Sequence, residues 1–171
     1  MIRPLLTWLL LAGTATLTAA CCGSVSCDCQ DGSADAVVFR FDRDSTQGGT
    51  GFRAAELTSV SIRRVPLDNT QQLRPDSVLL TRSRATTHRP IIINNAQPLA
   101  PNGTRKLNQY RYVIRLSGQN RQYSFDQIQL DGRFEADGCC TCYRNTQKIV
   151  YFNRRAYNQT VPGQDTVVLS R

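Results

Sequence analysis

A two-residue alternation of apolar and other side chains constrains this chain most, because only β-strands have that period. The clearest run spans residues 110–116, where Tyr and aliphatic side chains alternate with arginine and valine. Shorter runs cover 37–41 and 58–62. A turn signal at 117–120 is followed by a return at 123–125, and this order predicts a β-hairpin.

The pattern in the rest of the chain also predicts short strands separated by turns. Further strands are expected at 78–81, 90–93, 128–134, 148–153 and 166–169, with a turn or bulge at Asp131-Gly132. Seven or eight such strands predict an all-β fold, an antiparallel β-sandwich that is immunoglobulin-like in architecture; a small β-barrel is the alternative. The inward-facing positions predict a core of Phe39, Phe41, Val60, Ile62, Tyr112, Ile114, Leu116, Ile128, Leu130 and Phe134.

Three segments divide the chain. Residues 1–20 have the layout of a secretory signal peptide, in which a charged start at Arg3 precedes an apolar run and then small residues. Residues 21–35 form a cysteine-rich tether of Gly, Ser, Asp and Cys. Residues 36–171 are expected to form a single β-sandwich domain, because their number suits one hydrophobic core.

The end of the leader carries the sequence Leu17-Thr18-Ala19-Ala20-Cys21. This run resembles the lipobox of bacterial lipoproteins, although that family prefers leucine where this chain has Thr18. The resemblance implies lipidation of Cys21 and a membrane-anchored protein of the bacterial cell envelope, at the outer membrane. The alternative is an ordinary leader that releases a soluble secreted or periplasmic protein.

Seven cysteines give the second constraint. If Cys21 carries lipid, six remain in two clusters of three, and these disulfide candidates are Cys22, Cys27, Cys29, Cys139, Cys140 and Cys142. Near neighbours cannot easily bridge each other, so bridges between the clusters are expected. Sequence does not select among the crossing pairings. The alternative is a thiol-based metal site that uses Cys27, Cys29, Cys139, Cys140 and Cys142.

No catalytic pattern stands out. His88 is the only histidine and lies in a polar stretch, and no nucleophile-elbow motif occurs. We therefore expect no enzyme activity and no cofactor. The net charge of +8 rests on 19 arginines and two lysines. It favours an anionic envelope component or a protein as partner, besides the membrane reached through the N-terminal lipid, and an exported location argues against nucleic acid. The expected function is a non-enzymatic binding or structural role.

Overall fold

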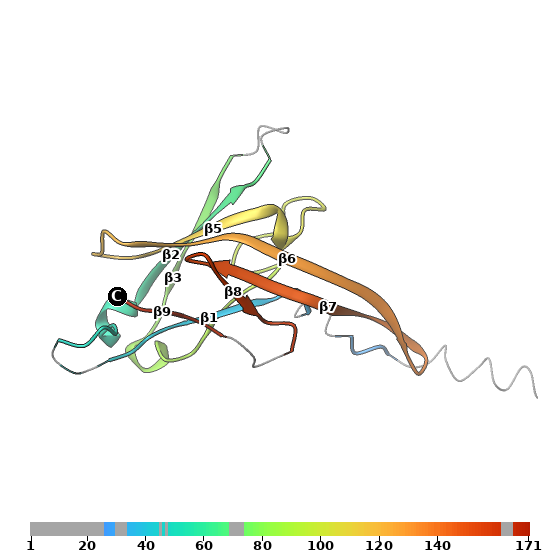
Figure 1. The fold of residues 1–171 in the computed structure, drawn as a ribbon, viewed down its shortest axis with the longest axis horizontal. Helices are drawn as coiled ribbons and strands as arrows, with labels where there is room; N and C mark the ends of the chain where they lie inside the picture. The colour runs from blue at the N-terminus through green and yellow to red at the C-terminus, as the bar shows by residue number, and fades with distance from the viewer. Residues whose placement is uncertain (1–25, 30–33, 45, 47, 69–73, 162–165) are drawn as a thin grey trace, which may run out of the picture.

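The computed structural model describes residues 26–29, 34–44, 46, 48–68, 74–161 and 166–171. Two β-sheets make up this part of the chain (Figure 1). The sheets stay open rather than closing into one barrel, so the predicted sandwich is confirmed and the alternative of a small barrel is wrong. The predicted signal peptide lies outside the described residues.

The smaller sheet has the order β4-β1-β9. Its strands are β4 (Ile91–Ile93), β1 (Val37–Phe41) and β9 (Val167–Leu169). β1 pairs with β4 in the antiparallel direction but with β9 in parallel. The parallel pair is a departure from the wholly antiparallel sandwich expected from the sequence. It joins strands near the two ends of the described chain.

The larger sheet has the order β3-β2-β5-β6-β7-β8, and all its strand pairs are antiparallel. The strands are β2 (Ser59–Pro66), β3 (Asp76–Thr81), β5 (Tyr110–Leu116), β6 (Gln122–Asp137), β7 (Cys140–Phe152) and β8 (Arg155–Asn158). Three short 3-10 helices lie in the connections: η1 (Ala54–Leu57), η2 (Arg84–Thr86) and η3 (Leu107–Gln109).

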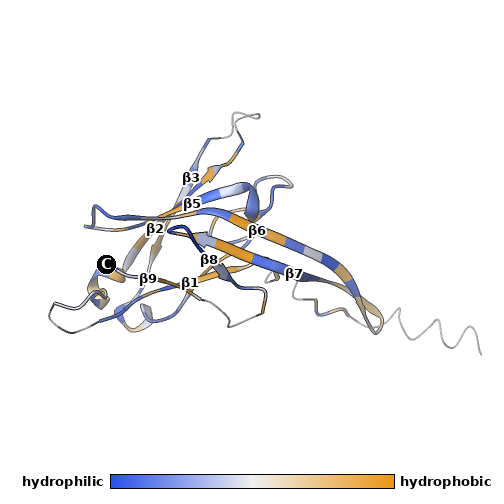
Figure 2. Ribbon diagram, viewed as in Figure 1, coloured by the Kyte–Doolittle hydropathy of each residue, from blue (hydrophilic) through white to orange (hydrophobic). Residues whose placement is uncertain are grey.

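Aromatic side chains from both sheets form the core. The ring of Phe39 on β1 lies 5.3 Å from that of Phe125 on β6, centroid to centroid, and Phe125 lies 5.6 Å from Phe152 on β7. Edge-on contacts of this kind add to the free energy of burial. Figure 2 shows hydrophobic and hydrophilic residues following one another along β6, where Ile128 and Leu130 alternate with glutamines.

The predicted core is largely confirmed. Eight of the ten candidates are buried: Phe39, Phe41, Val60, Ile62, Tyr112, Ile114, Leu116 and Ile128. Leu130 is partly buried against the core. The prediction that Phe134 belongs to the core is wrong, because its side chain is 67% exposed. By alternation Phe134 shares the face of Leu130, but the β6–β7 hairpin has by then passed beyond the smaller sheet, and none of the described strands covers that face (Figure 1).

The expected hairpin and bulge are both present. β5 pairs with β6 through registers such as Tyr112 with Phe125. A register shift between Asp131 and Gly132 confirms the predicted irregularity there. The sequence predicts two short strands, at 123–125 and 128–134, whereas the structure has one continuous strand of 16 residues, β6.

Candidate functional site

The distal half of the β6–β7 hairpin projects from the sandwich, and we call it the arm: residues 132–137 of β6 and 140–145 of β7 (Figure 1). β5 covers β6 only as far as Phe125, and β8 covers β7 only from Ile149 onward. The arm is therefore a two-stranded ribbon with neither edge paired to another described strand. Its turn uses Gly138 at φ +62°, which suits a tight hairpin turn.

Two disulfides join the N-terminal segment to the arm. Cys27 bonds to Cys140 and Cys29 to Cys142, with Cα–Cα distances of 5.5 and 5.3 Å. Both bridges span 113 residues, so the two segments run in the same direction in one register. The structure thus forms two of the predicted bridges between clusters. Cys139 is also disulfide-bonded.

The bridges define the chemistry of these cysteines. A disulfide sulfur carries no thiolate, which metal coordination requires. In the described ranges no group of three His, Cys, Asp or Glu side chains is arranged to hold a metal ion. The two bonds indicate an oxidising, exported environment. The predictions for Cys21 and Cys22 lie outside the described residues.

A buried polar cluster fastens the chain just before β1 to the root of the arm. Asp35 accepts hydrogen bonds from Asn95 Nδ2 at 2.9 Å and from Asn145 Nδ2 at 3.2 Å. Lys148 Nζ donates to the carbonyl oxygen of Ala34 at 3.0 Å. Burial lowers the pKa of Lys148, and the nearby Asp35 carboxylate acts in the opposite direction. The disulfides thus join Cys27 and Cys29 to the arm near its turn, and this cluster joins residues 34–35 to the root of the arm.

An aromatic pair of one exposed ring and one half-buried ring lies on the arm. The rings of Phe134 and Tyr143 meet edge-on with centroids 5.4 Å apart, and Lys106 Nζ lies 5.1 Å from the centroid of the Tyr143 ring. Tyr143 also lies over Gly132, where any Cβ would come within 2.6 Å of the tyrosine ring and hydroxyl. Glycine is therefore required at the bulge for this packing.

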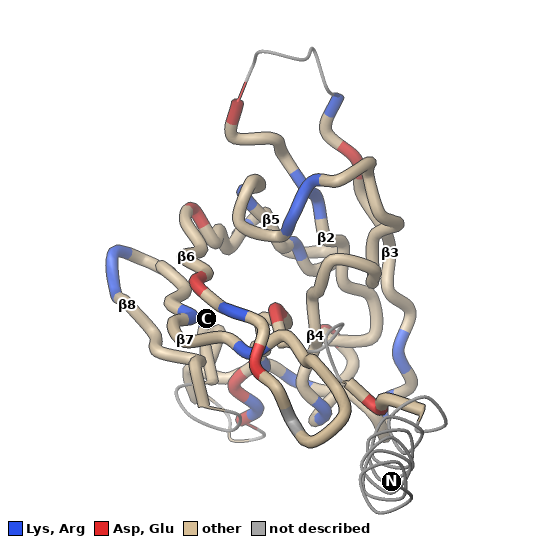
Figure 3. Tube along the Cα trace, turned by 90° about the vertical axis from the view of Figure 1, so that its right-hand side faces the viewer, with Lys and Arg blue, Asp and Glu red and all other residues tan. Residues whose placement is uncertain are grey.

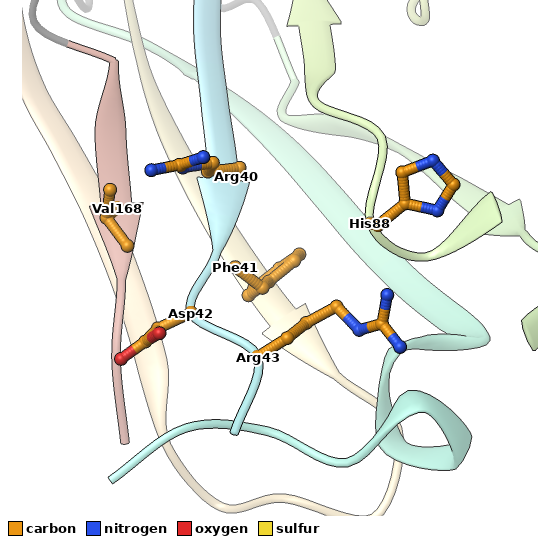
Figure 4. A pocket seen from close by; sticks show the side chains of 6 residues that line it. All are labelled: Arg40, Phe41, Asp42, Arg43, His88 and Val168. Carbon is orange, nitrogen blue, oxygen red and sulfur yellow. The ribbon is translucent and has the colours of Figure 1, made fainter. Parts of the chain in front are cut away.

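A small cationic cleft of about 290 Å³ opens beside β1. Arg40, Asp42, Arg43 and His88 line it together with Phe41 and Val168. Figure 4 shows Arg43 and His88 on one side of β1 and Arg40 directed to the other. Ser170 Oγ donates to Asp42 at 3.4 Å. His88 is exposed and makes no hydrogen bond within the described part of the chain, so the geometry assembles no acid–base pair around it.

Two arginines that are adjacent in the sequence lie in different surroundings. Arg63 is exposed, whereas its neighbour Arg64 points into the sandwich, binds Asp76 and stacks 4.7 Å from the centroid of the Tyr110 ring. Arg82 donates to the carbonyl oxygens of Thr86 and Arg89. Arg63 and Arg64 therefore do not form one charge pair on the surface.

Sequence reasoning missed the buried polar cluster and the arm. Asp35, Asn145 and Lys148 are residue types that are usually exposed, so nothing marks them as interior. The turn of the arm could have been predicted, because Asp137-Gly138 is a dipeptide typical of hairpin turns.

No protein-family model, curated protein or solved structure matches this chain. Among the residues described, no helix is both long and apolar enough to cross a membrane.

Proposed function

We propose that this protein is a non-enzymatic lipoprotein of the bacterial cell envelope, anchored through lipid on Cys21, whose sandwich binds an anionic envelope component. The observation that carries the proposal is the pair of disulfides that fix Cys27 and Cys29 on the arm. They indicate export, and they place the first described residues of the chain beside the arm, at one extremity of the described structure (Figure 1).

The spacing between the lipobox cysteine and the first bridge sets the distance from the membrane. Cys21 precedes Cys27 by six residues, and a chain of that length reaches at most about 22 Å. A lipid on Cys21 would keep the arm near the bilayer and direct the sandwich away from it. The anchor itself needs no further apolar segment, since two or more acyl chains give stable attachment.

The cysteine count also supports a lipid on Cys21. Four cysteines are paired in the two described bridges, and Cys139 is bonded as well. Pairing Cys139 with Cys22 would leave Cys21 as the odd cysteine. An odd thiol in an exported protein is a liability unless it is modified, and a thioether to lipid removes it.

The test is the intact mass of the protein taken from native membranes, followed by peptide mapping without reduction. We expect a chain that begins at Cys21 with added acyl mass, no free thiol before reduction, and a peptide joining Cys22 to Cys139. A Cys21→Ser variant serves as control and should lose both the acyl mass and the membrane fraction. A bond between Cys21 and Cys139, or an unmodified Cys21, would overturn the anchor.

A further inference from the structure

Three exposed arginines form a row on the outer face of the larger sheet, and we call them the arginine stripe: Arg63 on β2 with Arg111 and Arg115 on β5. The strand register puts Arg63 opposite Val113, between the two arginines of β5. Diagonal neighbours of this kind lie about 7–8 Å apart across an antiparallel pair. The side chains therefore present three guanidinium groups on one face, and Figure 3 shows basic residues along β2 and β5.

The three side chains of the stripe make no ion pair among the described residues. The side chains of Arg63 and Arg111 make no hydrogen bond within the described residues, whereas the Arg115 side chain donates to the neutral amide oxygen of Gln122 at 2.8 Å. The nearby acid is Asp126 on β6, whose carboxylate accepts a hydrogen bond from Ser124. Arg64, one position along β2, is satisfied by Asp76 on the inner face, so the difference follows the alternation of the strand.

Hydroxyl groups and a hollow surround the stripe. The register places Ser77 opposite Arg63 and Ser61 opposite Arg115. At one end, an open hollow of about 530 Å³ is lined by Val65, Pro66, Leu67, Arg111 and Asp126. The surface thus offers guanidinium donors for oxyanions, serine hydroxyls beside them, and a partly apolar recess.

We propose that the arginine stripe binds an anionic polysaccharide through its carboxylate or phosphate groups. This inference rests on the proposed envelope function, since it names the anionic component of that function. Guanidinium groups recognise carboxylate and phosphate in a bidentate manner, and serine hydroxyls exchange hydrogen bonds with sugar hydroxyls. No aromatic side chain lies among the register neighbours of the stripe, which disfavours single-stranded nucleic acid, because its bases stack on aromatic rings.

The experiment measures binding of the purified full chain to polygalacturonate and to phosphorylated dextran at low and high salt, with neutral dextran as the uncharged probe. We expect binding to one or both anionic polymers, weaker at high salt, and none to dextran. The variant Arg63→Gln/Arg111→Gln should bind about tenfold more weakly, since it loses two exposed charge-assisted contacts.

The matched control is Arg40→Gln/Arg43→Gln, which removes the same charge from the cleft beside β1. It should change the dissociation constant by about twofold or less, through the net charge alone. Arg63→Lys should bind with intermediate affinity, because it keeps the charge but not the bidentate geometry.

The same assay is run with polyuridylate RNA. Three results would overturn the assignment: no binding by the protein without substitutions, an equal loss of affinity in both double variants, or tighter binding to the RNA than to either polysaccharide. Lipid attachment is read separately from the mass of the same preparation. Failure of the anchor and failure of the stripe therefore give different outcomes.

Discussion

Removing the two bridges between the N-terminal segment and the arm should give a strongly non-additive loss of stability. Either bridge alone closes a loop of 113 residues. In the chain-entropy model, a loop of that size contributes about 5 kcal/mol to the free energy of unfolding. The second bridge then closes only a small ring, formed by the residues between the two pairs, and contributes about 2 kcal/mol.

These two free energies give the expected losses of stability for the variants that lack one bridge and for the variant that lacks both. Cys27→Ser/Cys140→Ser leaves the long loop closed by the other bridge, so it should cost about 2 kcal/mol, and Cys29→Ser/Cys142→Ser should cost the same. Removing all four cysteines opens the long loop and should cost about 7 kcal/mol. The excess over the sum of the two separate losses is about 3 kcal/mol, well above the error of a mutant cycle.

Urea unfolding under non-reducing conditions measures the cycle. Cys139 is itself disulfide-bonded, so every chain in the cycle, the reference included, carries Cys22→Ser and Cys139→Ser. Each loss is taken from the midpoint and slope of the unfolding curve. Equal and additive losses would refute the reasoning, because they would mean that each bridge acts through its own native contacts rather than through the entropy of a shared loop.

Three further substitutions test separate features of the fold. Tyr110 is buried with a hydroxyl that has no partner in the described structure, so Tyr110→Phe should raise the free energy of unfolding in urea by about 1 kcal/mol; a loss would reveal a partner for that hydroxyl. Burial lowers the pKa of Lys148, so below pH 10.5 and above that lowered pKa the unfolded chain binds more protons than the folded one. Stability should therefore rise with pH through this window, and Lys148→Met should flatten the slope of midpoint against pH; an unchanged slope would contradict this. Phe134→Ser should change the free energy of unfolding by about 0.5 kcal/mol or less, because the ring is exposed, whereas a loss of about 3 kcal/mol would restore Phe134 to the core.

Alternation of side chains predicted the fold wherever one face of a strand is covered. β1 and β5 bury every second residue, so their bounds and inner faces could be read directly from the sequence. The same rule places Arg63 on the exposed face and Arg64 on the buried face, although the two are adjacent in the sequence. A local charge count ignores which face each residue occupies, and that is why the arginine stripe was not anticipated.

The arm could not be predicted in the same way, for a physical reason. Beyond Gly132 neither face of the ribbon is covered by the smaller sheet, so no burial imposes an alternation there. Its position depends instead on the bridges and on the Asp35–Lys148 cluster, which join residues more than a hundred positions apart. The sequence limited the cysteines to crossing pairs, but the choice among those pairs required three-dimensional register.

The equal spacing of the two bridges has a consequence for the order in which the protein matures. Each bridge joins a cysteine to one made 113 residues later. Synthesis at about 5–20 residues per second takes roughly 6–23 s to cover that interval. Throughout that interval neither bridge can form, because the partner cysteines on β7 do not yet exist. β7 must therefore be made and in place before Cys27 and Cys29 can acquire their final partners.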